Sequence, residues 1–140
     1  ILQAISEMEG KYGLKCLNVF HAGDGNLHPL ILFDANDPDE LRRAEAFGNA
    51  ILKTAVALGG SITGEHGVGV EKLDAMCVQF TDAERAQMLA LKAAFDPRGH
   101  LNPGKAIPML ARCGEVRGGP AQAMGQTPAL RHALATLPRF

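Results

Sequence analysis

Two apolar runs lie on either side of a polar segment near the start of the chain. Residues 14–20 and 27–34 are rich in apolar and β-prone side chains, which predicts two strands. The polar segment contains Asp24-Gly25, a pair that favours a tight turn between antiparallel strands. The pattern therefore predicts a β-hairpin, in which Pro29 confines its strand to a sheet edge or a bulge.

Apolar residues at helical spacing predict helices on both sides of this hairpin. A first helix is expected over residues 1–10, with Gly10 and Gly13 as its stops. A second begins after Asp37, which can cap it, with Pro38 at the first helical position and Glu40 closing a capping box. Its apolar stripe ends before the glycines at 59–60.

Two shorter helices are expected further along the chain. One covers residues 70–76, and the other runs from a capping box of Thr81 and Glu84 to about residue 95. The order of helix, hairpin and further helices predicts an α+β fold, with a small antiparallel sheet packed by helices.

The last part of the chain is rich in Gly, Pro and Ala. We expect residues 1–112 to form the folded region and residues 113–140 to form a loose tail, with a short helix over 130–137. The chain begins with Ile1 rather than Met, inside a predicted helix, so we expect a piece of a longer protein.

Composition excludes several classes of protein. The formal net charge is −1, which gives no electrostatic argument for binding to nucleic acid or to an anionic membrane. No apolar run is long enough for a transmembrane segment, and no signal peptide is visible. Cys16, Cys77 and Cys113 are an odd number at wide spacing, which predicts no disulfide framework and indicates a reducing cytoplasm.

The segment HAGDGNLH, residues 21–28, places two histidines at the facing ends of the predicted strands. His21 shares a strand face with Leu17, and His28 shares one with Leu30. Two imidazoles in this position can supply half of a metal site. A turn that only hydrogen-bonds its own side chains is the alternative.

A second polar segment, GGSITGEHGVG, can supply a third ligand. Glu65 and His66 lie between glycines that let the backbone approach a ligand or cofactor closely. Two histidines and a carboxylate suit Zn²⁺ or a similar divalent ion. His66 would then be free to act as a general base.

Other candidate sites carry less weight. Residues 67–69 have neither the P-loop pattern nor the third glycine of a dinucleotide fingerprint, so a phosphate site is a minor alternative. Cys77 lies between apolar residues and is interpreted as a small buried side chain rather than a nucleophile. Lys105, in a Pro- and Gly-rich turn, is interpreted as solvated.

Taken together, HAGDGNLH, GGSITGEHGVGVEK and AAFDPRGHLNPGK resemble the C-terminal region of FAD-linked oxidases of the vanillyl-alcohol oxidase type. This family includes glycolate oxidase subunits and the D-lactate and D-2-hydroxyglutarate dehydrogenases. The resemblance covers residues 1–110 and implies the end of a cap, or substrate, domain, while FAD is bound mainly by an N-terminal domain that this sequence does not contain.

The resemblance also implies roles for individual residues. His21, His28 and Glu65 are expected to bind a divalent metal, Zn or Mn. His66 is expected to be the catalytic base near flavin and substrate, and Asn26 and Asn102 are expected to contact the cofactor.

The implied reaction is oxidation of a small 2-hydroxy acid to the 2-oxo acid, with hydride transfer to flavin. Relatives with a well-developed metal site carry a polar residue two places after the second histidine, and Leu30 stands there instead. This favours glycolate or D-lactate over a large diacid. The fragment alone is expected to be inactive.

The resemblance further implies iron–sulfur and flavoprotein partner subunits. A cytoplasmic location is expected. The alternative is attachment to the inner membrane through those partners. A different class of function stays open: a non-catalytic metal-binding or assembly module that docks a partner subunit. Adjacent Glu65 and His66 in a Gly-rich loop favour the enzyme.

Overall fold

The computed structural model describes residues 1–109 together with Cys113. The chain folds as two units, Ile1–Gly67 and Val68–Phe140. Within the described residues there are four helices and one two-stranded antiparallel sheet, which confirms the predicted α+β class. None of these helices is both long enough and apolar enough to cross a membrane.

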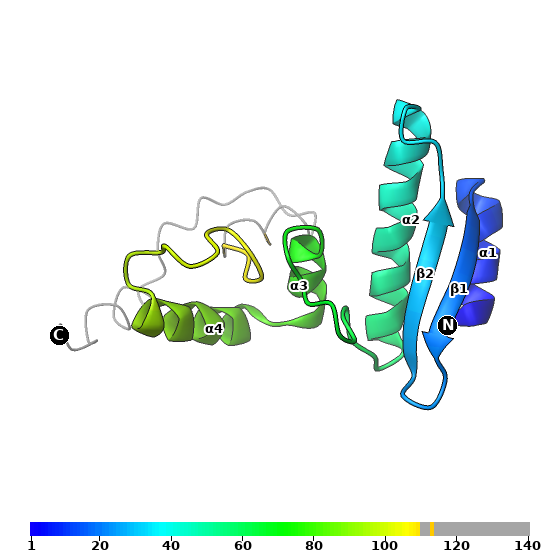
Figure 1. Ribbon diagram of the computed structural model, residues 1–140. Coiled ribbons are helices and arrows are strands. Elements are labelled where there is room, and N and C mark those ends of the chain that lie inside the picture. Colours follow the sequence, from blue (N-terminus) through cyan, green and yellow to red (C-terminus); the bar gives the residue numbers. More distant parts are fainter. Residues whose placement is uncertain (110–112, 114–140) are drawn as a thin grey trace. The chain divides into compact units, whose positions relative to one another are not determined.

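The first unit consists of a β-hairpin and two helices (Figure 1). Helix α1 covers Leu2–Tyr12, strands β1 and β2 cover Lys15–His21 and Asn26–Leu32, and helix α2 covers Pro38–Ala57. The strands pair in antiparallel register, so the predicted hairpin is confirmed. Because the sheet has two strands, both are edge strands, and Pro29 fits inside β2.

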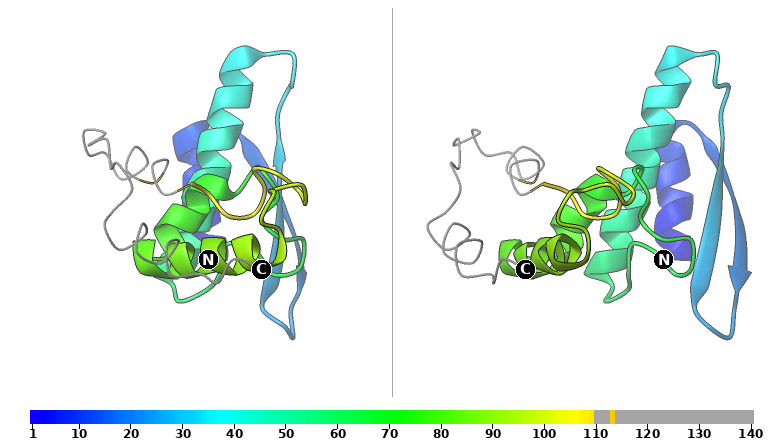
Figure 2. Two further views of the ribbon diagram at one scale, coloured as in Figure 1. Left: turned by 90° about the vertical axis from the view of Figure 1, so that its left-hand side faces the viewer. Right: turned by 60° about the vertical axis from the view of Figure 1, so that its left-hand side comes forward.

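Both helices lie on the same side of the hairpin, as the two views of Figure 2 show. Cys16 of β1 pairs with Ile31 of β2, and both side chains point toward this helical side. Tyr12 of α1 stacks on Phe47 of α2, with ring centroids 5.2 Å apart. The buried residues of this core are Ile5, Leu14, Cys16, Ala44, Phe47 and Ile51.

The opposite face of the hairpin is exposed and mostly apolar. The side chains of Leu17 and Val19 of β1 and of Leu30 and Leu32 of β2 lie on it, and all four are about half exposed. Side chains alternate between the two faces of a strand, so this face also carries His21 and His28. The predicted ligands thus lie on the side of the sheet away from the core.

Polar contacts at the helix ends fix the helices against the hairpin. Helix α1 continues through Gly10, so of the two glycines expected to end it, Gly10 is wrong and Gly13 is confirmed. It ends at Gly13, which has φ 64°. Arg43 of α2 donates to the carbonyl of Tyr12 at 2.8 Å, and the amide of Cys16 donates to Glu9 at 2.8 Å. These bonds join α1 to both α2 and β1.

The start of α2 confirms one predicted cap and corrects another. The Asp37 side chain accepts hydrogen bonds from the amides of Asp39 and Glu40, as expected for an N-cap. Glu40 does not close a capping box on Asp37. Its carboxylate accepts from the amide of Asp34 at 2.7 Å instead, because the chain folds back there before the helix begins.

The second unit contains two helices among its described residues. Helix α3 covers Leu73–Gln79, three residues later than predicted, and helix α4 covers Asp82–Phe95. The capping box of Thr81 and Glu84 is confirmed. The helix predicted over 130–137, and all of the predicted tail except Cys113, lie outside the described residues.

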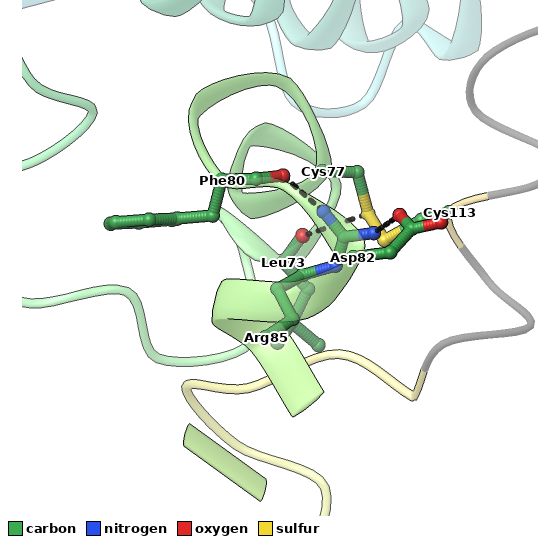
Figure 3. Close-up of a disulfide and its surroundings, with 6 residues drawn as sticks. All are labelled: Leu73, Cys77, Phe80, Asp82, Arg85 and Cys113. Atoms are coloured by element: carbon green, nitrogen blue, oxygen red, sulfur yellow. Dashed lines mark hydrogen bonds and ion pairs between the residues drawn. A yellow bond between two sulfur atoms is a disulfide. The ribbon is translucent and has the colours of Figure 1, made fainter. Parts of the chain in front are cut away.

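A disulfide joins Cys77 of α3 to Cys113 (Figure 3). Both residues are buried, so the interpretation of Cys77 as a buried side chain is confirmed, but the expectation that the cysteines form no disulfide is wrong. The two residues are 36 positions apart, and only the tertiary fold brings them together. Cys16 is the free cysteine and lies in the core of the first unit.

Arg85 of α4 is buried close to the end of α3 (Figure 3). Its guanidinium donates to the carbonyl of Phe80 and pairs with the carboxylate of Asp82. A buried cation is tolerated where it is paired and hydrogen-bonded. Arg85 therefore fixes the connection between α3 and α4.

We expect the disulfide to restrict the unfolded chain. For a closed loop of this length, 36 residues, the entropic effect is about 4 kcal/mol, so the Cys77→Ser/Cys113→Ser variant should unfold at a lower denaturant concentration. In the denatured but unreduced wild type, an alkylating reagent should label Cys16 alone, as read by mass spectrometry. Labelling of all 3 cysteines before reduction would contradict the disulfide.

Candidate metal centre

The hairpin turn places the two predicted histidine ligands next to each other. The amide of Asp24 donates to the carbonyl of His21 at 3.0 Å, and Gly25 follows with φ 69°, a left-handed conformation that glycine adopts without strain. His21 pairs with Asn26 in the register, and His28 lies two residues further along β2. The two imidazoles meet edge to face, with ring centroids 5.4 Å apart.

The loop that follows α2 brings Glu65 to these histidines. Ile62, near the start of this loop, is buried. The Thr63 hydroxyl accepts from the amide of Gly67 at 2.9 Å, which closes the loop around the Glu65-His66 pair. A side-chain bond of this kind replaces regular backbone pairing in a short loop.

Gly64 lies directly against Asn26 of the hairpin. A Cβ built on Gly64 would overlap the Asn26 side-chain amide, so with any larger residue the Asn26 side chain must turn away or the two segments must move apart. The sequence pattern suggested that the glycines allow a ligand or cofactor to approach. The structure shows that Gly64 allows the loop to approach the hairpin.

Glu65 is at the centre of the resulting cluster. Its Oε1 lies 2.9 Å from Nε2 of His28, 3.4 Å from Nε2 of His66 and 3.9 Å from Nε2 of His21. One ligand atom from each of His21, His28 and Glu65 can be chosen so that all three lie within 4.8 Å of one another. The structure therefore brings the three predicted metal ligands together.

The cluster is supported on one side and open on the other. The His28 side chain is 23% exposed, whereas that of His66 is 71% exposed. The His66 ring lies beside that of His28, with centroids 5.1 Å apart. Two imidazoles and a carboxylate match the donors that divalent zinc prefers, and the open side leaves room for further ligands.

The predicted site residues belong to different units. His21, Asn26, His28, Glu65 and His66 lie together in the first unit, whereas Asn102 lies in the second. Thr63 and Gly64 shape the loop; sequence reasoning gave Thr63 no role and expected Gly64 only to let a ligand or cofactor approach. Thr63 shows one usable signal: a hydroxyl residue four positions before Gly67 in a Gly-rich loop is typical of a turn closed by a side chain.

The family follows from a comparison with known proteins. Residues 1–106 match the family described as FAD linked oxidases, C-terminal domain. The chain belongs to this family. The predicted resemblance is therefore confirmed, and the histidine–glutamate cluster lies inside the matched region.

Individual relatives of the chain are enzymes or enzyme subunits by name. It is 57% identical over 115 residues to the glycolate oxidase subunit GlcD of Escherichia coli K12, covering 82% of the chain and 23% of the relative. It is 44% identical over 112 residues to GlcD of Bacillus subtilis, covering 80% of the chain and 24% of the relative. It is 43% identical over 91 residues to D-2-hydroxyglutarate dehydrogenase of Stutzerimonas stutzeri, covering 61% of the chain and 19% of the relative. The chain spans about a quarter of the length of the GlcD relatives.

We expect Gly64→Ala to move Glu65 away from the histidines, because the added methyl group overlaps the side chain of Asn26. The ring resonances of His21, His28 and His66 should shift in two-dimensional NMR spectra of the metal-free chain. Gly10→Ala is the matched control, since Gly10 lies in α1 with open space around its Cβ position, and its helix should gain up to about 1 kcal/mol of stability. Equal histidine shifts in both variants would contradict the close approach.

Proposed function

We propose that this chain is the C-terminal part of an FAD-dependent oxidoreductase that oxidises a small 2-hydroxy acid to the 2-oxo acid. The observation that carries the proposal is the cluster of His21, His28 and Glu65 with His66 beside it. Glycolate, D-lactate and D-2-hydroxyglutarate, which the relatives' names contain, are all 2-hydroxy acids.

A divalent metal fits the chemistry of this cluster. His21, His28 and Glu65 would hold it, because imidazole nitrogens and a carboxylate oxygen suit Zn²⁺, and Mn²⁺ also accepts this mixed set. A bound ion supplies Lewis-acid stabilisation of the substrate oxygen. Glu65 approaches all three histidines, so it orients the imidazoles as well as providing a ligand atom.

His66 is proposed as the general base. A neutral imidazole keeps one ring nitrogen as a proton acceptor, and the exposed ring of His66 is accessible to a substrate beside the cluster. Glu65 lies 3.4 Å from its Nε2, close enough to stabilise the imidazolium that forms when His66 takes the hydroxyl proton. FAD, when bound, supplies the acceptor for the hydride from the α-carbon.

The residues next to the histidines favour a small substrate. Val19 pairs with His28 across the hairpin, and Leu30 follows on the same face. Both side chains are apolar and offer no partner for a second carboxylate. Glycolate and D-lactate, with one carboxylate each, are therefore the preferred substrates over a diacid.

Contacts with FAD and with other proteins complete the proposal. Asn26 lies beside the cluster, and His66 and Asn102 have exposed side chains, so these three residues are assigned to the cofactor.

Because the GlcD relatives are named as subunits, partner subunits are proposed, including an iron–sulfur protein and a flavoprotein. The proposed location is the cytoplasm, with attachment to the inner membrane through these partners.

The proposal predicts a flavin reaction that depends on His66. When this chain is joined to an FAD-binding segment of the length that its relatives have, the protein should be yellow. Glycolate or D-lactate should bleach its flavin absorbance without oxygen. His66→Ala should retain the flavin and lower the rate of bleaching by about 10²–10⁴-fold, the usual effect of losing a general base. His100→Ala, at an exposed histidine of the second unit, is the control.

Two results would count against this proposal. A colourless protein, or a flavin that neither acid reduces, would contradict the oxidoreductase. If His66→Ala stays fully active while His28→Ala unfolds the protein, the cluster is structural, and the chain is better described as a non-catalytic metal-binding or assembly module.

The proposed metal site predicts selective binding by the chain itself. Calorimetric titration with Zn²⁺ or Mn²⁺ should show one site per chain, and Glu65→Ala should weaken it by at least about tenfold, as losses around metal ligands do. His100→Ala should leave the affinity unchanged, since His100 lies outside the cluster. Equal affinities of wild type and Glu65→Ala would show that the ion binds elsewhere.

A further inference from the structure

The chain that follows α4 folds back onto the side chain of Asp96. Oδ1 of this carboxylate accepts from the amide of His100 at 2.9 Å, and Oδ2 accepts from the amide of Leu101 at 2.8 Å. The Asp96 side chain is 7% exposed, although it stands at the end of a surface helix. It therefore serves as an acceptor for the backbone that leads into the LNPGK segment.

Lys92, one turn earlier on α4, completes this arrangement. Its Nζ donates to Oδ2 of Asp96 at 2.9 Å and to the carbonyl of Leu101 at 2.7 Å. The amide and the carbonyl of Leu101 are thus both bonded to side chains at the end of α4. Since the carbonyl of Leu101 belongs to the peptide plane that includes the amide nitrogen of Asn102, that plane is fixed.

Backbone hydrogen bonds also hold the turn that follows Asn102. Asn102 has φ 44°, in the left-handed region that asparagine tolerates better than most residues. Its carbonyl accepts from the amide of Lys105 at 3.2 Å, and the amide of Ala106 donates to the carbonyl of Gly69 at 2.8 Å. The backbone of Asn102 is fastened on both sides, which leaves its side-chain torsions as the main freedom.

We propose that Asp96, with Lys92 as its counter-ion, is a positioning residue that fixes the backbone from which the Asn102 side chain reaches its ligand. This inference rests on the proposed function, which assigns Asn102 to the flavin. Asp96 reaches the ligand only through the turn, whereas Asn102 would touch it.

The chemistry of the contacts requires a carboxylate at position 96. Ionised Asp is acceptor-only, so both oxygens can receive N–H donors, whereas Asn would turn an NH₂ group toward one of them. The Lys92 ammonium and then the Leu101 amide hold the pKa of Asp96 below its usual range. The charged form that the contacts require is therefore the form present at neutral pH.

The first test measures amide hydrogen exchange in the 140-residue chain. Asp96→Asn and Lys92→Met should each speed exchange at His100 and Leu101 by about tenfold, the effect of losing a charge-assisted hydrogen bond. Lys53→Met, at an exposed lysine of α2, is the matched control and should leave these amides unchanged. Unchanged exchange at Leu101 in Asp96→Asn would overturn the proposal.

The second test is a double-mutant cycle in the flavin-containing protein. Asp96→Asn should lower kcat without loss of flavin and should shift the flavin absorbance in the same direction as Asn102→Gly. The glycine variant keeps the left-handed backbone and removes the side chain. If Asp96 acts through Asn102, Asp96→Asn should have little further effect on kcat in the Asn102→Gly background.

The outcomes separate positioning from a general structural role. Additive losses in the double variant, or a lowered melting temperature with kcat and spectrum unchanged, would overturn the role of Asp96. A wild-type protein that binds no flavin would remove the proposed function, and the exchange experiment would then decide by itself whether Asp96 holds the turn.

Discussion

The approach of the Glu65 loop to the hairpin is the constraint on which the candidate centre depends. Gly64 packs against Asn26 with no room for a side chain, and this brings Oε1 of Glu65 to 2.9 Å from His28. Without that approach the hairpin has two histidines on an exposed face and no third ligand. The helices on the other face supply the core, so the side that carries the predicted ligands lies outside it and is exposed.

The two units share one structural feature, a loop that is held by a polar side chain. In each, a short Gly-containing loop is held by a polar side chain where regular backbone pairing stops: Thr63 in the first unit and Asp96 in the second. Each loop carries a residue assigned to the reaction, His66 or Asn102. In the proposed enzyme, Thr63 and Asp96 would touch no substrate and would still set how precisely His66 and Asn102 are held.

The sequence predicted what depends on local patterns. The hairpin, the N-cap at Asp37 and the capping box at Thr81 follow from turn chemistry and capping preferences, and the structure confirms them. The closeness of the three predicted ligands follows from strand alternation and from the resemblance. Tertiary contacts were not predictable in this way: Cys113 meets Cys77 across a sequence separation of 36, and Glu40 bonds to Asp34 because of a bend in the preceding chain.

The most direct test of the central claim is zinc-edge X-ray absorption of the chain loaded with one equivalent of Zn²⁺. We expect nitrogen and oxygen ligands at about 2.0–2.2 Å, with histidine scattering that decreases in His28→Ala. No bound zinc, a sulfur ligand at about 2.3 Å, or a spectrum unchanged by His28→Ala would contradict a centre built from the hairpin and the Glu65 loop.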